Sequence, residues 1–214
     1  RNFGYRLSAI EPRDGYDGTA VLTAPLLGKL VWGDLRYVPH LGANPLAAER
    51  ENTSDESHFA KILTQQVTKV INVPVMSDSS AAGLAGCIYN MTVPNIDNWR
   101  RFTQYEYASG VGIAQVYADL TVAKKVVLHI MDGLIATYAG GPEAHPNFAV
   151  HEATLLASKD PVAIDVLALA RLEELRARAK LPPIGDVAAH VRASAEMGLG
   201  QGVRNRIVVK DVGR

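Results

Sequence analysis

The chain has 214 residues, of which 48% are apolar and 21% are charged, a composition typical of a globular protein. Its 22 basic and 22 acidic residues cancel, whereas nucleic-acid-binding proteins usually carry a basic excess. Its apolar runs are shorter than the roughly 20 residues that span a bilayer. A single cysteine excludes a self-contained iron–sulfur cluster or a four-thiolate zinc site. We therefore expect one domain over residues 1–214, with no nucleic-acid partner and no membrane span.

The N-terminal quarter, residues 1–54, is rich in loop signals. Apolar runs between residues 20 and 38 are interrupted by Pro and Gly and suggest short strands or a hairpin. The chain begins at Arg1 without a signal sequence, so we expect a further N-terminal portion to precede it. The sequence leaves the compartment open between the cytoplasm and export to the periplasm of a bacterium.

The rest of the chain alternates between helix-like and strand-like segments. Helical spacing or capping residues predict helices over residues 55–69, 79–89, 110–120, 160–180 and 186–197. Apolar runs predict strands over residues 70–76, 125–131, 154–157 and 206–212. Pro74 indicates an edge or a bulge, and Asp160-Pro161 is the clearest helix start. This alternation predicts an α/β domain with a mostly parallel or mixed sheet flanked by helices.

Asp165 lies in the segment PVAIDVLALA, which is apolar on nearly every face and predicts a buried helix. An unpaired buried carboxylate costs several kcal/mol, so we expect a partner, a proton or a metal ion at Asp165. The structural alternative is an ion pair, or hydrogen bonds to the amides of a neighbouring loop. The functional alternative is a metal ligand.

Asp132 follows the predicted strand VVLHIM and precedes Gly133. Ligands of open α/β sheets bind beyond the carboxyl ends of the strands, so Asp132 is a candidate ligand. An Asp-Gly turn, in which the carboxylate caps its own backbone, explains the same pair of residues. Both interpretations stay open.

The stretch SDSSAAGLAGCIYN, residues 77–90, places very small side chains after a predicted strand. Asp78 or Ser79 could cap the helix that follows, and its first amides could then approach an anion. Close packing of a helix on the sheet explains the small residues equally well. Cys87 is expected to be a small buried apolar residue and not a nucleophile.

Four stretches resemble the bacterial and archaeal family catalogued as domain of unknown function 362: INVPVMSDSSAAGLAGCIYNMTVPNIDNWRRF, VVLHIMDGLIATYAGGP, LLASKDPVAIDVLAL and AEMGLGQGVRNRIVV. They occur in the family's order and spacing and cover most of the chain from about residue 60. The positions that match the family pattern are Asn90, Asp132, Gly133, Asp160, Pro161 and Asp165. The resemblance identifies a family without naming a reaction.

This chain also departs from its relatives. Some members carry ferredoxin-type cysteine clusters or twin-arginine export signals, and this chain shows neither. Relatives often have Lys and His in place of Ser77-Asp78-Ser79, and Lys in place of Tyr89, so a basic anion site is not expected here. The family has further strands and helices upstream of a segment like RNFGYRLSAI, which supports the expected N-terminal portion.

The leading hypothesis is a polar cleft at the carboxyl edge of the sheet, lined by Asp78, Ser79, Asn90 and Asp132. Asp78, Asp132 and Asp165 are the candidate ligands of a divalent metal ion, and a small polar molecule is the other candidate ligand. An enzymatic role is left open. The alternative is a non-catalytic accessory or binding module for a redox or metalloprotein partner, in which the carboxylates are structural. Convergence of these side chains in one pocket would distinguish the two.

Overall fold

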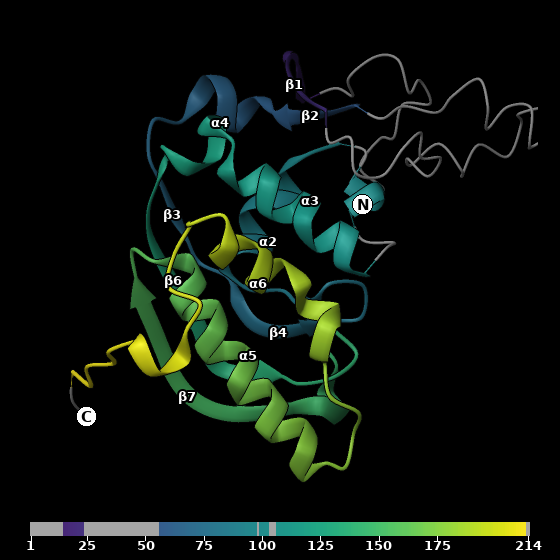
Figure 1. Ribbon diagram of the computed structural model, residues 1–214, viewed down its shortest axis with the longest axis vertical. Coiled ribbons are helices and arrows are strands. Elements are labelled where there is room, and N and C mark those ends of the chain that lie inside the picture. Colours follow the sequence, from purple (N-terminus) through teal and green to yellow (C-terminus); the bar gives the residue numbers. More distant parts are fainter. Residues whose placement is uncertain (1–14, 24–55, 98, 103–105, 213–214) are drawn as a thin grey trace, which may run out of the picture.

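The main sheet is mixed and is built around one long strand, β6 (Val126–Thr137). Strands β3 (Val70–Asn72) and β4 (Val75–Ser79) follow one another along one edge of β6 and run parallel to it. Strand β7 (Ala149–Ser158) pairs antiparallel with the other edge, and the short β5 (Gly83–Leu84) adds to β4. Figure 1 shows the computed structural model, which describes residues 15–23, 56–97, 99–102 and 106–212.

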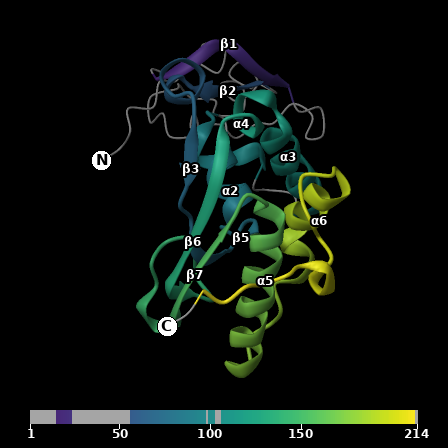
Figure 2. The same ribbon diagram turned by 90° about the vertical axis from the view of Figure 1, so that its left-hand side faces the viewer.

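The helices pack together on one side of this sheet. They are α2 (Cys87–Thr92), α3 (Glu106–Ala118), α4 (Leu120–Ala123), α5 (Pro161–Arg178) and α6 (Ala189–Glu196). Figure 2 shows α5 and α6 on one side of β6 and β7. No helix among the described residues is long and apolar enough to cross a membrane.

The two faces of the sheet differ in burial because strand side chains alternate. Met76 and Met131 point toward the helices and are almost fully buried. On the opposite face Ile71, Val73 and Leu155 are each more than half exposed. Sheet stability therefore comes mainly from the helix-covered face.

The predicted fold class is confirmed, since a mixed sheet with flanking helices is present. The predicted helix over 160–180 is confirmed as α5: the Asp160 carboxylate accepts a hydrogen bond from the Ala163 amide at 2.8 Å, and Pro161 occupies the first turn. The helices predicted over 110–120 and 186–197 correspond to α3 and to a 3-10 turn followed by α6.

The strand predicted over residues 70–76 is present but broken at Val73-Pro74, which separates β3 from β4. Proline has no amide hydrogen to donate to the ladder. Its carbonyl still accepts a hydrogen bond from the Asp132 amide at 2.8 Å. The register against β6 is the same on both sides of the break, since Asn72 pairs with His129 and Val75 with Asp132. Among the described residues β3 pairs only with β6, so the break lies on an outer strand, as Pro74 indicated.

The helix predicted over residues 55–69 is wrong. Strand β2 (Glu56–Ala60) pairs with β1 (Tyr16–Thr23) in a separate two-stranded sheet, and only Ile62–Gln66 is helical, as a π-helix. Asp97 fixes the strand, because its carboxylate accepts a hydrogen bond from the His58 amide at 2.6 Å. The helical spacing of apolar residues in this segment was misleading, because pairing of β2 with β1 determines its conformation. The remaining expectations for residues 1–14 and 24–54 lie outside the described residues.

The predicted end of one strand and the whole of another predicted strand are also wrong. Asp132-Gly133 does not end the strand, because β6 continues to Thr137 and pairs with β7 along that extension. The strand predicted over 206–212 is not formed, and Val208 and Val212 are 84% and 97% exposed. The apolar residues of that tail have no strand to pair with among the described residues.

Candidate functional site

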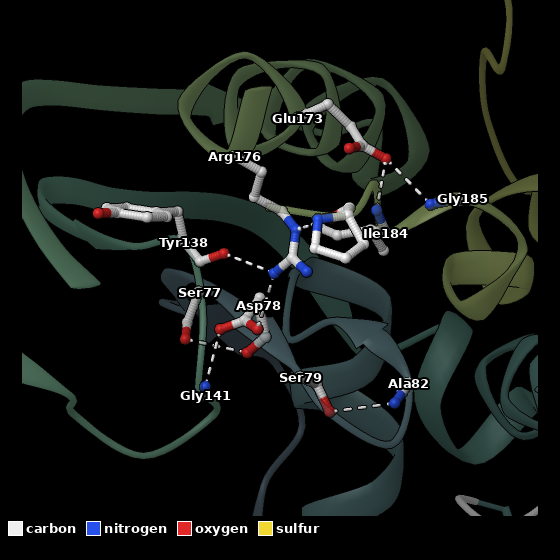
Figure 3. A network of polar contacts seen from close by, with 11 residues as sticks. Ser77, Asp78, Ser79, Ala82, Tyr138, Gly141, Glu173, Arg176, Ile184 and Gly185 are labelled. Atoms are coloured by element: carbon white, nitrogen blue, oxygen red, sulfur yellow. Dashed lines mark hydrogen bonds and ion pairs between the residues drawn. The ribbon is translucent and has the colours of Figure 1, made fainter. Parts of the chain in front are cut away.

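Asp78 is buried near the end of β4, where it meets the loop between β6 and β7. One carboxylate oxygen accepts a hydrogen bond from the Gly141 amide at 2.8 Å, and the other lies 3.6 Å from the Arg176 guanidinium (Figure 3). Burial raises the pKa of Asp78, while the Gly141 amide and Arg176 act in the opposite direction. Asp78 thus joins three segments that are far apart in the sequence.

Arg176 completes this connection from α5. Its guanidinium donates to the carbonyls of Tyr138 at 2.9 Å and Pro182 at 2.7 Å. The network of Asp78, Gly141 and Arg176 therefore holds the β6–β7 loop against the end of α5. Such a set of contacts suits a structural junction.

Ser79 and Asn90 take part in different contacts. The Ser79 hydroxyl accepts a hydrogen bond from the Ala82 amide at 3.2 Å. The Asn90 side chain donates a hydrogen bond to Oδ1 of Asn72 at 2.7 Å. Asn72 donates in turn to the Cys87 carbonyl and to Nδ1 of His129, both at 2.9 Å.

His129 ends this buried chain of hydrogen bonds. Its Nδ1 accepts from Asn72, so Nε2 carries the proton and faces the Tyr117 hydroxyl at 3.1 Å. Burial lowers the pKa of His129 to about 4. His129 is therefore a neutral, hydrogen-bonded imidazole in the core.

Asp132 lies in the middle of β6, directly opposite Val75 and Leu155 in the ladder. Its carboxylate accepts a hydrogen bond from the Leu134 amide at 2.9 Å. The parallel arrangement of β4 and β6 is as expected, but the strand does not end at Asp132. This contact matches the self-capping alternative for Asp132.

Asp165 is fully buried and caps α2 from a different helix. Its two oxygens accept hydrogen bonds from the amides of Cys87 at 2.6 Å and Ile88 at 3.0 Å. Gly86 permits this approach, because a Cβ at that position would lie 2.2 Å from the carboxylate. Burial raises the pKa of Asp165 to about 7, and the two amides oppose that rise.

The small residues that precede α2 are explained by this packing. A Cβ on Gly83 would lie 2.5 Å from the backbone nitrogen of Ala188, and Gly83 adopts a φ of +76°. The helix predicted from Ser79 is wrong, since α2 begins only at Cys87 and its cap is Asp165 instead of Asp78 or Ser79. Cys87 is fully buried, and burial raises the pKa of its thiol, so it behaves as the expected small apolar residue.

The predicted site residues thus have separate hydrogen-bond partners. Asp78 binds the β6–β7 loop, Asp132 its own strand and Asp165 the start of α2. Within the ranges that the structure describes, no group of three or more His, Cys, Asp or Glu side chains could hold a metal ion. Their roles as ligands of a metal or a small molecule stay predictions.

A different feature has the shape of a binding site. A cavity of about 670 Å³ opens between α5, the 3-10 turn Gly185–Ala188, α6 and the chain that follows α6, and we call it the interhelical cavity. Pockets for small ligands usually measure about 300–1,000 Å³. Its lining consists of Val166, Leu169, Ala170, Glu173, Gly185, Asp186, Ala188, Ala189, Val191, Arg192, Ala195, Glu196, Gly200, Gln201, Gly202 and Val203.

The wall of the cavity follows from helix periodicity. Val166, Leu169, Ala170 and Glu173 share one face of α5, because they are spaced three and four residues apart. The chain after α6 closes the far end, since the Asp160 carboxylate accepts a hydrogen bond from the Gln201 amide at 2.8 Å. Small side chains keep the space between the helices open.

Sequence reasoning missed this cavity because it searched for polar residues at strand ends. A local signal existed in the apolar and small residues on one face of α5. The rest of the lining comes from the 3-10 turn, α6 and the chain after α6, and nothing in the sequence places these segments opposite that face. The cavity therefore exists only in the tertiary structure.

Comparison with protein families matches residues 41–170 to the family described as "Domain of unknown function (DUF362)". No curated protein and no solved structure matches the chain. Most residues that line the interhelical cavity follow the matched span.

Proposed function

We propose that this chain, which belongs to the DUF362 family, is a non-catalytic binding module that takes up a small molecule in the interhelical cavity. The observation that carries the proposal is the 670 Å³ space with largely apolar walls and a charged rim. A concave, mostly apolar pocket with a few polar groups is the usual form of a small-molecule site.

The contacts of the carboxylates support a binding role over a catalytic one. A general acid or base must reach a substrate atom, but Asp165 is enclosed and accepts hydrogen bonds from two backbone amides. Asp78 is buried between Gly141 and Arg176. These aspartates join backbone segments and leave substrate recognition to another part of the chain.

The position of the cavity also suits a binding module. Its walls come from α5, the 3-10 turn Gly185–Ala188, α6 and residues 200–203, and Asp160 ties residues 200–203 to the start of α5. The cavity is therefore formed by ordered helices and by a clamped segment. A pre-formed pocket loses less entropy when it binds a ligand than one that must first become ordered.

A cavity-filling substitution tests the proposal. Ala170→Phe places an aromatic ring in the space, whereas the matched variant Ala177→Phe adds the same ring to an exposed position of α5 that does not line the cavity. Fragments found by ligand-observed NMR with the unaltered chain should bind Ala177→Phe normally and Ala170→Phe at least tenfold more weakly. Fragments that bind both variants alike would overturn the proposal.

A further inference from the structure

We infer that the ligand of the interhelical cavity is an organic cation with a hydrocarbon or aromatic body. The inference rests on the proposed function and adds the chemical class of the ligand. It is drawn from the charges at the rim of the cavity together with its apolar walls. Three carboxylates and one guanidinium line the rim: Glu173, Asp186, Glu196 and Arg192.

The walls determine the body of the ligand. The lining includes the aliphatic side chains of Val166, Leu169 and Ala170 on α5 and of Val191 and Ala195 on α6. Aliphatic side chains of this kind favour a ligand that removes apolar surface from water. A strongly hydrated ligand without an apolar part would gain nothing from these walls.

Glu173 is positioned by the fold and keeps one oxygen available. Its Oε1 accepts hydrogen bonds from the amides of Ile184 at 2.9 Å and Gly185 at 3.0 Å. Figure 3 shows both contacts ending at the same oxygen. Within the described part of the chain, Oε2 accepts no hydrogen bond, so it can accept one from a ligand ammonium group.

Arg192 does not neutralise the rim. Its guanidinium lies 3.5 Å from Asp186 and 3.9 Å from Glu196, and all three side chains are more than half exposed. Exposed ion pairs of this kind have weak interaction energies, because water screens the charges. Three negative charges and one positive charge leave a formal charge of −2 beside apolar walls, which strengthen the local field. That field attracts a cation and repels an anion.

Three probes with the same hydrocarbon chain test the inference: octyltrimethylammonium, octyl glucoside and octyl sulfate. Each is titrated below its critical micelle concentration into isotopically labelled protein, and NMR shifts of the amides from Ala188 to Val203 locate the binding. We expect the cation to bind at least tenfold more tightly than the neutral probe, a difference of about 1.4 kcal/mol. The sulfate should bind more weakly than either. Higher salt should reduce the preference.

Charge variants at the rim supply the control. The double variant Asp186→Asn with Glu196→Gln should bring the affinities for the cation and the neutral probe close together. Arg192→Gln should change the preference in the opposite direction and strengthen binding of the cation about two- to fivefold. In both variants the affinity for octyl glucoside should stay within twofold, because the walls are unchanged.

The outcomes separate this inference from the proposed function. Equal binding of all three probes, abolished by Ala170→Phe, would leave the small-molecule site in place and overturn the charge preference. Tighter binding of octyl sulfate would also overturn it. Absence of shifts in α5 and α6 with every probe would instead count against the cavity as a site.

Discussion

Individual aspartates in this protein act by accepting hydrogen bonds from backbone amides of other segments. Asp165 caps α2, Asp78 binds the Gly141 amide, and Asp160 binds both α5 and the Gln201 amide. A carboxylate suits this task because it offers two acceptor oxygens. Each of these residues therefore fixes a junction between elements that are distant in sequence.

Asp165→Leu tests the strongest of these junctions. The substitution keeps a similar bulk but leaves the amides of Cys87 and Ile88 buried without an acceptor. A loss of about 2–4 kcal/mol in the free energy of unfolding is expected. Urea unfolding should show the same loss with and without a chelator. A smaller loss in the presence of the chelator would support Asp165 as a metal ligand.

Asp132→Asn examines the residue on which the predicted cleft mostly depended. Asparagine can still accept a hydrogen bond from the Leu134 amide, so we expect stability to change by less than about 0.5 kcal/mol. Calorimetric titration with divalent metal ions should give the same result for both proteins. A tenfold weaker binding of any ion to the variant would support a ligand role for Asp132.

His190 makes stability depend on pH. It is fully buried, no described residue gives either ring nitrogen a hydrogen bond of normal geometry, and burial lowers its pKa to about 4. A backbone group of Ala82 near the ring opposes that shift. Between pH 6.5 and 4 the unfolded chain takes up a proton that the folded chain excludes, so stability is lost as pH falls through this window.

Other groups with shifted pKa values also titrate near this window. His129 also has a pKa of about 4 and adds to the loss, whereas Asp165, with a pKa raised to about 7, stabilises the fold below its unfolded pKa and loses that contribution as pH rises toward 7. Asp78, whose pKa is also raised by burial, acts in the same direction as Asp165. His190→Leu should remove the contribution of His190 to the slope of unfolding free energy between pH 6.5 and 4, which is up to about 1.4 kcal/mol per pH unit. An unchanged slope would contradict the lowered pKa.

At the scale of elements, α5 and α6 end in the same way with different residues. After α5 the Leu181 and Lys180 amides donate to the carbonyls of Arg176 and Ala177, and after α6 the Leu199 and Gly198 amides donate to those of Ser194 and Ala195. Both are Schellman motifs, which need a left-handed residue. Lys180 has a φ of +58° and Gly198 a φ of +75°.

This pair of helix ends gives a matched prediction. Lys180→Gly removes the strain of a side chain in the left-handed region and should stabilise the protein by up to about 1 kcal/mol. Gly198→Ala should destabilise it by a similar amount, although no atom lies within 4 Å of the added Cβ. Thermal unfolding of both variants measures the two effects. If both variants changed stability in the same direction, contacts of the side chain and not backbone conformation would determine the effect.

At the scale of the whole molecule, the sheet is stabilised from one side. Met131 on the helix-covered face is fully buried, whereas Leu155 on the other face is 59% exposed. Met131→Ala should cost about 2–5 kcal/mol, and Leu155→Ala less than about 1 kcal/mol. Chemical denaturation of the two variants tests this difference. Similar losses would mean that the second face is also covered.

Local patterns determined the parts of the fold that neighbouring residues can fix. Asp160-Pro161 set the start of α5, and apolar runs set the cores of β3, β4 and β6. The same patterns misplaced the end of β6 and the start of α2, because β7 and Asp165 decide them from elsewhere in the chain. A pairing partner or a distant cap leaves no local signature.

The sequence by itself determined an α/β domain of the DUF362 family and required a partner for the carboxylate in the apolar helix α5. Only the tertiary structure decided that this partner is a pair of backbone amides and that α5 and α6 enclose a cavity. The physical reason is that a buried charge needs a hydrogen-bond or ion-pair partner in any fold. The need for a partner at Asp165 is therefore visible in the spacing of the apolar residues around it. Which group is that partner, and which helix faces enclose space, depend on packing between residues far apart along the chain.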